Sequence, residues 1–268
     1  TLSGLSSGFF DLDLLTQGFQ KSDLIIIAGR PSMGKTALGL NIALNIIRNS
    51  KLPVLFFSLE MSKEQIIYRL LSIEANINQT RLKSGKLYQE DWIKLNKIMK
   101  IMSKMPFFID DTPNLSIQDI QSKIKTILFE QGKLGVIIID YLQLMQNPKL
   151  KIENRVQELS VITRALKNIA RQFNIPVITL SQLSRNVETR VNKKPILSDL
   201  RESGSIEQDA DLVLMLYRNK YYNLKSEDEE GLDFTDLIIA KQRNGPTGTT
   251  KLKFDEKRTK FLNTGFES

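Results

Sequence analysis

Eight consecutive residues near the N-terminus have the types and the spacing that phosphate binding requires. The segment Gly29-Arg30-Pro31-Ser32-Met33-Gly34-Lys35-Thr36 follows the apolar run 24–28 and fits the P-loop pattern G-x-x-x-x-G-K-[ST]. Its two glycines permit a tight turn whose backbone N–H groups converge on one anion. We expect Lys35 to reach the β- and γ-phosphates of a nucleoside triphosphate, and the Thr36 hydroxyl to bind Mg²⁺. The predicted nucleotide-binding residues are Gly29, Arg30, Pro31, Ser32, Met33, Gly34, Lys35, Thr36 and Ala37.

The sequence around this segment supplies the elements that a P-loop needs. An apolar run typical of a buried strand precedes it. A helix predicted over residues 35–49 adds its positive N-terminal end at the same point. The alternative is a glycine-rich turn that binds nothing, and the pattern together with its context disfavours it. We therefore predict that the protein binds a nucleoside triphosphate.

Strands and helices alternate along the chain. Most predicted strands are near-continuous apolar runs, which is typical of a parallel sheet covered by helices on both faces. The predicted strands are 24–28, 53–60, 107–110, 135–140, 176–181, 211–217 and 237–240, followed by a C-terminal hairpin, 250–254 and 259–262. The predicted helices are 35–49, 62–75, 79–104, 116–131 and 153–173. Residues 62–65 have the pattern of a capping box, which opens the helix 62–75. The pattern predicts an α/β fold with a mostly parallel sheet, flanking helices and a C-terminal β-hairpin.

Three further segments are predicted to be loops. Turn-forming residues dominate 1–23, a polar, basic segment covers 182–203, and an acidic loop covers 219–234. The length of 268 residues suits one large α/β domain. We divide the chain into an N-terminal linker segment, 1–22, and a domain, 23–268. Because the chain starts at Thr1 without Met, we expect it to be part of a longer protein.

Composition narrows the possible functions. The formal net charge of +8 favours a polyanionic partner. The chain has no Cys and no His, which excludes thiolate chemistry, His-based catalytic triads and His–zinc sites. It also has no apolar run near the length of a transmembrane helix, so we expect no membrane association.

Acidic residues follow several of the predicted strands. In a parallel sheet, ligands bind where the carboxyl ends of the strands meet. We therefore expect functional residues where the apolar runs end, at Glu60, Asp140, Ser181-Gln182 and Lys241-Gln242-Arg243. Asp140 follows a run of β-branched residues and is the favoured Mg²⁺ ligand. Asp110 and Asp111 compete for this role because they also end an apolar run, but their strand is short and Pro106 suggests a sheet edge. We therefore interpret them as the acidic start of a loop. Glu60 either activates water or stabilises the N-terminus of the next helix, and both interpretations remain open.

Two groups of cations have a possible role in binding phosphate. Lys241 and Arg243 leave a strand on the same side, just before a Gly/Pro turn. They reach a γ-phosphate held by an adjacent subunit, as an arginine finger does, or they are solvated charges at a strand end. The segment 182–208 either contacts nucleic-acid phosphates or is a solvated basic loop. Its cations are Arg185, Arg190, Lys193, Lys194 and Arg201.

Several motifs in the same order resemble one known family. They are 28–36, 57–61, 139–144, 180–185, 199–211 and 241–248, and the entry segment, 8–13 with 16–18, is similar too. Together they resemble the C-terminal motor domain of the DnaB-type replicative helicases, over essentially the whole chain. The N-terminal helical domain and the linker helix of that family are not visible in this sequence.

The resemblance implies a fold, an activity and residue roles. It implies a RecA-like domain in a homo-hexameric ring that uses ATP and Mg²⁺ to move 5′ to 3′ on single-stranded DNA and to unwind the duplex at a replication fork. Lys35 and Thr36 would bind phosphate and Mg²⁺, Asp140 would bind Mg²⁺, and Glu60 would activate water. Gln182 would sense the γ-phosphate, and Lys241 and Arg243 would enter the neighbouring subunit's site. Arg201, Glu202 and Gly204 would hold DNA phosphates, and we add Arg185 from the basic segment.

The resemblance also implies partners and a location. Primase and a helicase loader would bind the full-length protein, in the cytoplasm at the replication fork or in the plastid stroma. Two other functions are compatible with a P-loop. A RecA-type recombinase or clock-type ring would use ATP to control assembly, and a small-molecule kinase would transfer phosphate to an acceptor without stimulation by DNA.

Overall fold

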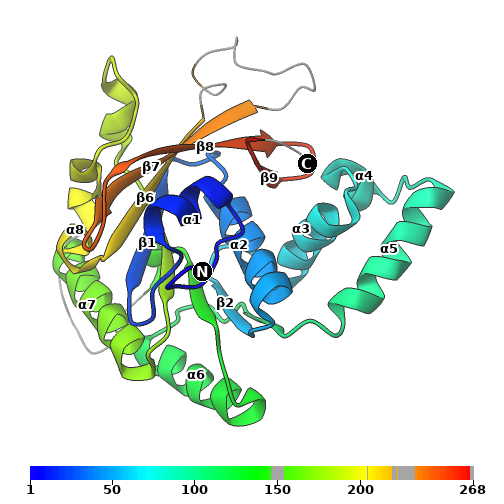
Figure 1. The fold of residues 1–268 in the computed structure, drawn as a ribbon, viewed down its shortest axis with the longest axis horizontal. Helices are drawn as coiled ribbons and strands as arrows, with labels where there is room; N and C mark the ends of the chain where they lie inside the picture. The colour runs from blue at the N-terminus through cyan, green and yellow to red at the C-terminus, as the bar shows by residue number, and fades with distance from the viewer. Residues whose placement is uncertain (146–153, 204, 219–221, 223–232, 266–268) are drawn as a thin grey trace.

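The helices and strands lie close to their predicted positions. The computed structural model describes residues 1–145, 154–203, 205–218, 222 and 233–265, and of 201–203 only the backbone (Figure 1). The strands are β1 Leu24–Gly29, β2 Val54–Ser58, β3 Phe107–Asp110, β4 Val136–Asp140, β5 Val177–Gln182, β6 Leu212–Arg218, β7 Asp233–Gln242, β8 Gly248–Asp255 and β9 Lys260–Asn263. The α-helices are α1 Phe10–Thr16, α2 Lys35–Ser50, α3 Lys63–Ala75, α4 Gln79–Ser84, α5 Gln89–Met102, α6 Ile117–Gln131, α7 Arg155–Phe173 and α8 Ile206–Asp209. Short 3₁₀ turns are η1 Leu142–Leu144, η2 Arg185–Thr189 and η3 Leu197–Ser203.

The described strands form one sheet in the order β3-β2-β4-β5-β1-β6-β7-β8-β9. The six strands from β3 to β6 are parallel, whereas β7, β8 and β9 each pair antiparallel with the preceding strand. The mostly parallel sheet and the C-terminal hairpin were both predicted, and both are confirmed. Because β7 runs against its neighbours, its end lies at the opposite edge from the ends of β1, β4 and β5.

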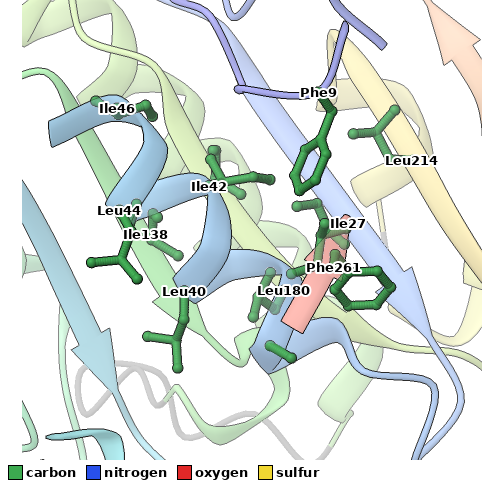
Figure 2. Packing of buried hydrophobic residues seen from close by; sticks show 14 of the residues in the cluster. Phe9, Ile27, Leu40, Ile42, Leu44, Ile46, Ile138, Leu180, Leu214 and Phe261 are labelled. Carbon is green, nitrogen blue, oxygen red and sulfur yellow. The ribbon is translucent and has the colours of Figure 1, made fainter. Parts of the chain in front are cut away.

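Helices cover both faces of the sheet (Figure 1). One apolar cluster joins α1, α2 and α3 to alternate strand residues such as Ile27 and Ile138. The other joins α6 and α7 to the residues between them, such as Ile26 and Ile139. Figure 2 shows the first cluster, in which Ile42 of α2 lies among sheet residues. The period of two in the buried strands therefore assigns successive side chains to opposite cores.

Local capping explains where several helices begin. Ser62 accepts a hydrogen bond from the Gln65 N–H, and the Gln65 side chain accepts one from the Ser62 N–H, so the predicted capping box at α3 is confirmed. Ser116 and Asp119 make the same arrangement at α6. The hydrogen bonds from the Ser116 backbone and hydroxyl lower the pKa of Asp119 below its ordinary value.

Two predicted segments differ from the structure. The N-terminal loop contains helix α1, because Asp13 accepts hydrogen bonds from Ser6 and Ser7 while Phe9 and Leu12 pack into the core. The single helix predicted over 79–104 is two helices, α4 and α5. Gly85 separates them in a left-handed conformation with φ of 70°.

Loop boundaries also shifted. Strand β7 begins at Asp233, inside the acidic loop predicted over 219–234, and most of that predicted loop lies outside the described residues. The basic segment 182–203 contains η2 and η3, and Arg190 binds both Asp199 carboxylate oxygens, at 2.7 and 2.9 Å. Among the described helices, none combines the length and the apolar character that a membrane crossing needs.

A partly buried ion pair lies at the amino-end edge of the sheet. Lys167 of α7 donates from Nζ to Asp211 Oδ2 at 2.6 Å, and the same oxygen accepts the Leu24 N–H at 2.8 Å. Asp23 lies beside this pair. Burial, followed by repulsion from Asp211, raises the pKa of Asp23 to about 6, although Lys167 and Arg243 act in the opposite direction.

Replacing Asp23 by Asn should remove a pH-dependent cost to stability. The folded-state pKa of Asp23 lies above its ordinary value of 3.8, so the folded protein binds this proton more tightly than the unfolded chain does. The stabilisation from protonation is therefore present below pH 3.8 and is lost as the pH rises through about 6. We expect Asp23→Asn to be more stable than wild type near neutral pH, with the difference disappearing in acid. Urea-unfolding midpoints across this range measure it, and parallel curves for the two proteins would contradict it.

Candidate nucleotide-binding site

The P-loop forms the turn between β1 and α2. Ser32 and Gly34 have left-handed backbone conformations, with φ of 70° and 90°. A Cβ atom on Gly34 would lie 3.0 Å from Cζ of Phe261 in β9, so this position requires glycine for two reasons. Helix α2 begins directly afterwards at Lys35, and its first N–H groups have no partners within the helix. The turn therefore presents backbone donors at the carboxyl ends of the parallel strands.

Not all predicted nucleotide-binding residues point outward. Met33 and Ala37 are buried and belong to the core cluster beneath the loop, so their side chains support its shape. Arg30 binds Glu188 and the Leu183 carbonyl, at 3.1 and 2.8 Å, and so ties the loop to the segment after β5. Backbone groups of Gly29, Pro31 and Ser32 complete the turn.

Thr36 and Asp140 meet across the sheet. The Thr36 hydroxyl, in the first turn of α2, donates to Asp140 Oδ2 at 2.8 Å, although β5 lies between β1, which leads into the P-loop, and β4, which ends at Asp140. Asp140 is completely buried, and its second carboxylate oxygen, Oδ1, has no hydrogen-bond partner among the described residues. Burial raises the pKa of Asp140 to about 6, against the lowering effects of Thr36 and Lys35. A buried carboxylate oxygen with no donor favours a cation at this point.

Lys35 lies in the same charged group. Its Nζ is 4.8 Å from the ring centroid of Tyr141, and only 7% of the residue is exposed. Burial lowers the pKa of Lys35, while attraction to Asp140 and Glu60 opposes the shift. Burial thus disfavours the charged form of both Lys35 and Asp140. An anionic ligand beside Lys35 and a cation beside Asp140 would stabilise these charged forms.

A pocket of about 640 Å³ opens in front of these groups. Glu60, exposed at the end of β2, and Gln182, at the end of β5, both line it, as predicted for residues at strand ends. Its other charged lining residues are Arg30, Lys35, Lys83, Arg69, Arg218 and Glu256. Most of the charged residues that line the pocket are cationic, which favours the binding of a polyanion.

Two arginines in this pocket were not predicted from the sequence. Arg69 projects from α3, and its Nε is buried with no hydrogen-bond partner in the described part of the chain. Burial lowers the pKa of Arg69, while Asp140 and Glu60 attract the cation. Arg69 stands four residues after Gln65, also a lining residue, and this helical spacing is the signal that could have identified it. Arg218 ends β6, one residue beyond the predicted end of that strand.

The competing carboxylates make local contacts elsewhere. Asp110 accepts the Thr112 N–H, and Asp111 accepts the Lys63 N–H at the start of α3, both at 2.9 Å. Strand β3, which carries Asp110, is an edge strand, so the prediction of an edge is confirmed.

Lys241 and Arg243 lie away from the P-loop of their own chain. Lys241 of β7 pairs with Val213 of β6, and Val213 pairs in turn with Ile26 of β1. Arg243 lies still further toward the amino ends of the parallel strands. Gly29 is three residues beyond Ile26, or roughly 10 Å along the strand. The expectation that these cations share an edge with Glu60 and Asp140 is therefore wrong, because β7 is antiparallel.

Both cations contact the C-terminal end of α8. Lys241 Nζ donates to the carbonyls of Glu207 and Gln208, at 2.7 and 3.2 Å. Arg243 donates to the Gln208 carbonyl at 3.2 Å, and its Nη1 lies 3.0 Å from Asp211 Oδ1. Burial, followed by repulsion from Arg243, lowers the pKa of Lys241.

The predicted DNA-binding residues are only partly described. Arg185 is exposed at the start of η2. The backbone of Arg201 and Glu202 belongs to η3, and Gly204 lies outside the described residues.

A P-loop between a parallel strand and a helix, with an acid at the end of another parallel strand, defines a P-loop nucleotide-binding domain. Residues 4–263 match the family described as the DnaB-like helicase C terminal domain. The chain belongs to this family.

Named relatives agree with that assignment. The chain is 72% identical over 261 residues to a probable replicative DNA helicase of Trieres chinensis, and 52% identical over 262 residues to the replicative DNA helicase DnaB of Geobacillus stearothermophilus. These alignments cover 97% and 98% of the chain but only 57% of each relative. A solved DnaB-like replicative helicase, described with its interactions with primase, has a TM-score of 0.93 at 41% identity, over 99% of this chain and 63% of that one. A solved ATPase domain gives the same TM-score and identity, with 93% of its length covered.

Alanine substitutions at two left-handed glycines should differ in cost. At Gly85, with φ of 70° and open space around it, Ala should cost about 1 kcal/mol of stability from backbone strain alone. At Gly34 the same strain is joined by the contact with Phe261, so Gly34→Ala should cost more. Chemical unfolding of the two variants measures the difference. Equal losses would show that the P-loop does not pack against β9 as described.

Proposed function

We propose that this chain is the ATP-hydrolysing motor domain of a replicative DNA helicase, moving 5′ to 3′ on single-stranded DNA. The observation that carries the proposal is the contact between Thr36 and the buried Asp140 beneath a P-loop, in a chain of the DnaB-like helicase C-terminal family. Relatives that are replicative helicases align along almost the whole chain.

In this proposal the P-loop binds ATP through residues 29–37. Backbone N–H groups and the start of α2 hold the phosphates, and Lys35 adds a cation. Thr36 and Asp140 would hold Mg²⁺, which fits Oδ1 of Asp140, because no described residue forms a hydrogen bond with that oxygen. When bound, Mg²⁺ supplies positive charge to the β- and γ-phosphate oxygens.

Glu60 and Gln182 act on the γ-phosphate side of the pocket. Glu60 is exposed there and is available to orient or deprotonate water, since no described residue forms an ion pair with it. Gln182 senses the γ-phosphate. Gln143 donates to Ser181 Oγ at 2.9 Å and accepts the Gln182 N–H at 3.2 Å, so the backbone beneath the sensor is fixed.

Lys241 and Arg243 complete the site of a neighbouring protomer. Their position at the amino-end edge, away from their own P-loop, supports a contribution between subunits of a homo-hexamer. Hydrolysis then requires assembly, and movement of the segment with Arg185, Arg201, Glu202 and Gly204 advances single-stranded DNA. Primase and a helicase loader are further proposed partners of the complete protein.

Strand displacement tests the proposed activity directly. The complete protein, supplied with ATP and Mg²⁺, should separate a forked duplex that carries a 5′ single-stranded tail. Single-stranded DNA should stimulate its ATPase activity, and rising salt should weaken the stimulation because phosphate contacts release counterions. Lys35→Ala is the inactive control. A protein that pairs strands, or that ignores DNA while phosphorylating a small acceptor, would contradict the proposal.

Removing Arg243 should separate hydrolysis from binding. If Arg243 acts on the neighbour's γ-phosphate, Arg243→Ala should reduce ATP hydrolysis about 10³-fold or more while nucleotide affinity changes little. Arg171→Ala, at another exposed arginine near the end of α7, is the matched control. Normal turnover by Arg243→Ala would overturn the shared site.

A further inference from the structure

Arg218 connects the P-loop to the C-terminal strands, β7, β8 and β9. It ends β6, is 5% exposed, and donates from Nη1 to the Ser32 carbonyl at 2.8 Å. Ser32 is the P-loop residue with a φ of 70°. The side chain therefore contacts the backbone of the loop at its left-handed turn.

This contact fixes the orientation of one peptide unit. A carbonyl and the following N–H point in opposite directions across a planar peptide. The Met33 N–H donates to the Arg30 carbonyl at 3.2 Å, while Arg218 binds the carbonyl at the other side of the same peptide. Both polar groups of the unit are thus occupied within the protein. The peptide cannot rotate without losing two hydrogen bonds, one of them charge-assisted.

The guanidinium is itself held in place from several sides. Its Nε and Nη2 donate to Asp233 Oδ2, at 3.1 and 2.7 Å, and Nη2 lies 3.5 Å from Glu256 Oε2. The ring of Phe254 lies beneath it, with 4.5 Å between the guanidinium carbon and the ring centroid. A guanidinium with these partners has little freedom to swing toward a ligand, so it acts as a fixed support.

The same strands contact the loop at a second point. Phe254 and Phe261 pack with their ring centroids 4.5 Å apart, and Phe261 lies against Gly34. The C-terminal strands thus contact both left-handed residues of the P-loop, Ser32 through Arg218 and Gly34 through Phe261.

We propose that Arg218 is a positioning residue for nucleotide binding, which holds the P-loop in its binding conformation by donating to the Ser32 carbonyl. This inference rests on the proposed function of the pocket as a nucleoside triphosphate site. Arg218 lines that pocket, so a direct phosphate contact is the competing role. The positioning role predicts equal losses for nucleotides with two and three phosphates, whereas a γ-phosphate contact predicts a loss for the triphosphate alone.

Arg218→Lys tests the proposal in the complete protein. Lysine keeps a positive charge next to the buried Asp233, but one ammonium cannot reproduce the planar fork that serves Asp233 and Ser32 together. We expect wild-type folding and stoichiometry, and an affinity at least about tenfold weaker for both methylanthraniloyl-ADP and methylanthraniloyl-ATPγS, since a hydrogen bond from a charged donor is lost. Arg218→Met should bind more weakly still.

Arg258→Met is the matched control. Arg258 also binds a carboxylate and a backbone carbonyl, Asp255 at 2.8 Å and Asn76 at 3.2 Å, without a described contact to the P-loop. Its nucleotide affinity should equal that of wild type.

The possible outcomes are distinct. If wild type itself fails to bind either nucleotide, the proposed function fails. If wild type binds both nucleotides, three results for Arg218→Lys overturn the positioning role. The first is wild-type affinity for both nucleotides, and the second is weaker binding of the triphosphate alone. The third is a smaller fraction of folded or binding-competent protein whose remaining sites keep wild-type affinity.

Discussion

The structure depends on charge buried at one edge of a parallel sheet. Asp140 is inaccessible to water, hydrogen-bonded through one oxygen to Thr36, and close to Lys35. Burial raises the pKa of the acid and lowers that of the lysine, so it destabilises the charged form of each group. A cation beside Asp140 and an anion beside Lys35 would stabilise these charged forms. In our proposal, Mg²⁺ and the phosphates of ATP interact with these two buried groups.

The sheet also divides the proposed site between subunits. Parallel strands bring Lys35, Asp140, Glu60 and Gln182 to one edge, as their carboxyl ends must meet there. The antiparallel β7 carries Arg243 to the other edge, where carbonyls of α8 and the Asp211 carboxylate hold it. A protomer built this way cannot bring its own Arg243 to its own nucleotide without breaking the sheet. In our proposal, ATP hydrolysis therefore requires assembly of protomers, because the antiparallel direction of β7 makes Arg243 available only to a neighbouring protomer.

Sequence patterns predicted the parallel core well because its signals are local. The β-branched run before Asp140 and the capping box at Ser62 each specify an element without help from distant residues. The N-terminal helix α1 was missed because Asp13 stabilises it through Ser6 and Ser7, and Phe9 packs into the core. The sequence pattern of β7 does not show whether the strand runs parallel or antiparallel to its neighbours. Lys241 and Arg243 were therefore wrongly expected at the same edge of the sheet as Glu60 and Asp140.

The site was less predictable where residues act through other residues. The P-loop is continuous in sequence, so its residues and the following helix were found directly. Arg69 and Arg218 come from elements whose patterns describe only packing, and the tertiary fold alone brings them to the pocket. Arg218 illustrates the limit, since its partners Ser32, Asp233 and Phe254 all lie far from it in the sequence.

Mixing two inactive variants tests the shared site most directly. Lys35→Ala removes the phosphate-binding cation but keeps Arg243, and Arg243→Ala has the opposite defect. In a mixed assembly, an intact P-loop on one protomer meets an intact Arg243 on the next at some interfaces. ATP hydrolysis by the mixture should therefore rise well above the sum of the two variants alone. Activity no greater than that sum, in mixed assemblies verified to form, would contradict a site completed by the neighbouring protomer.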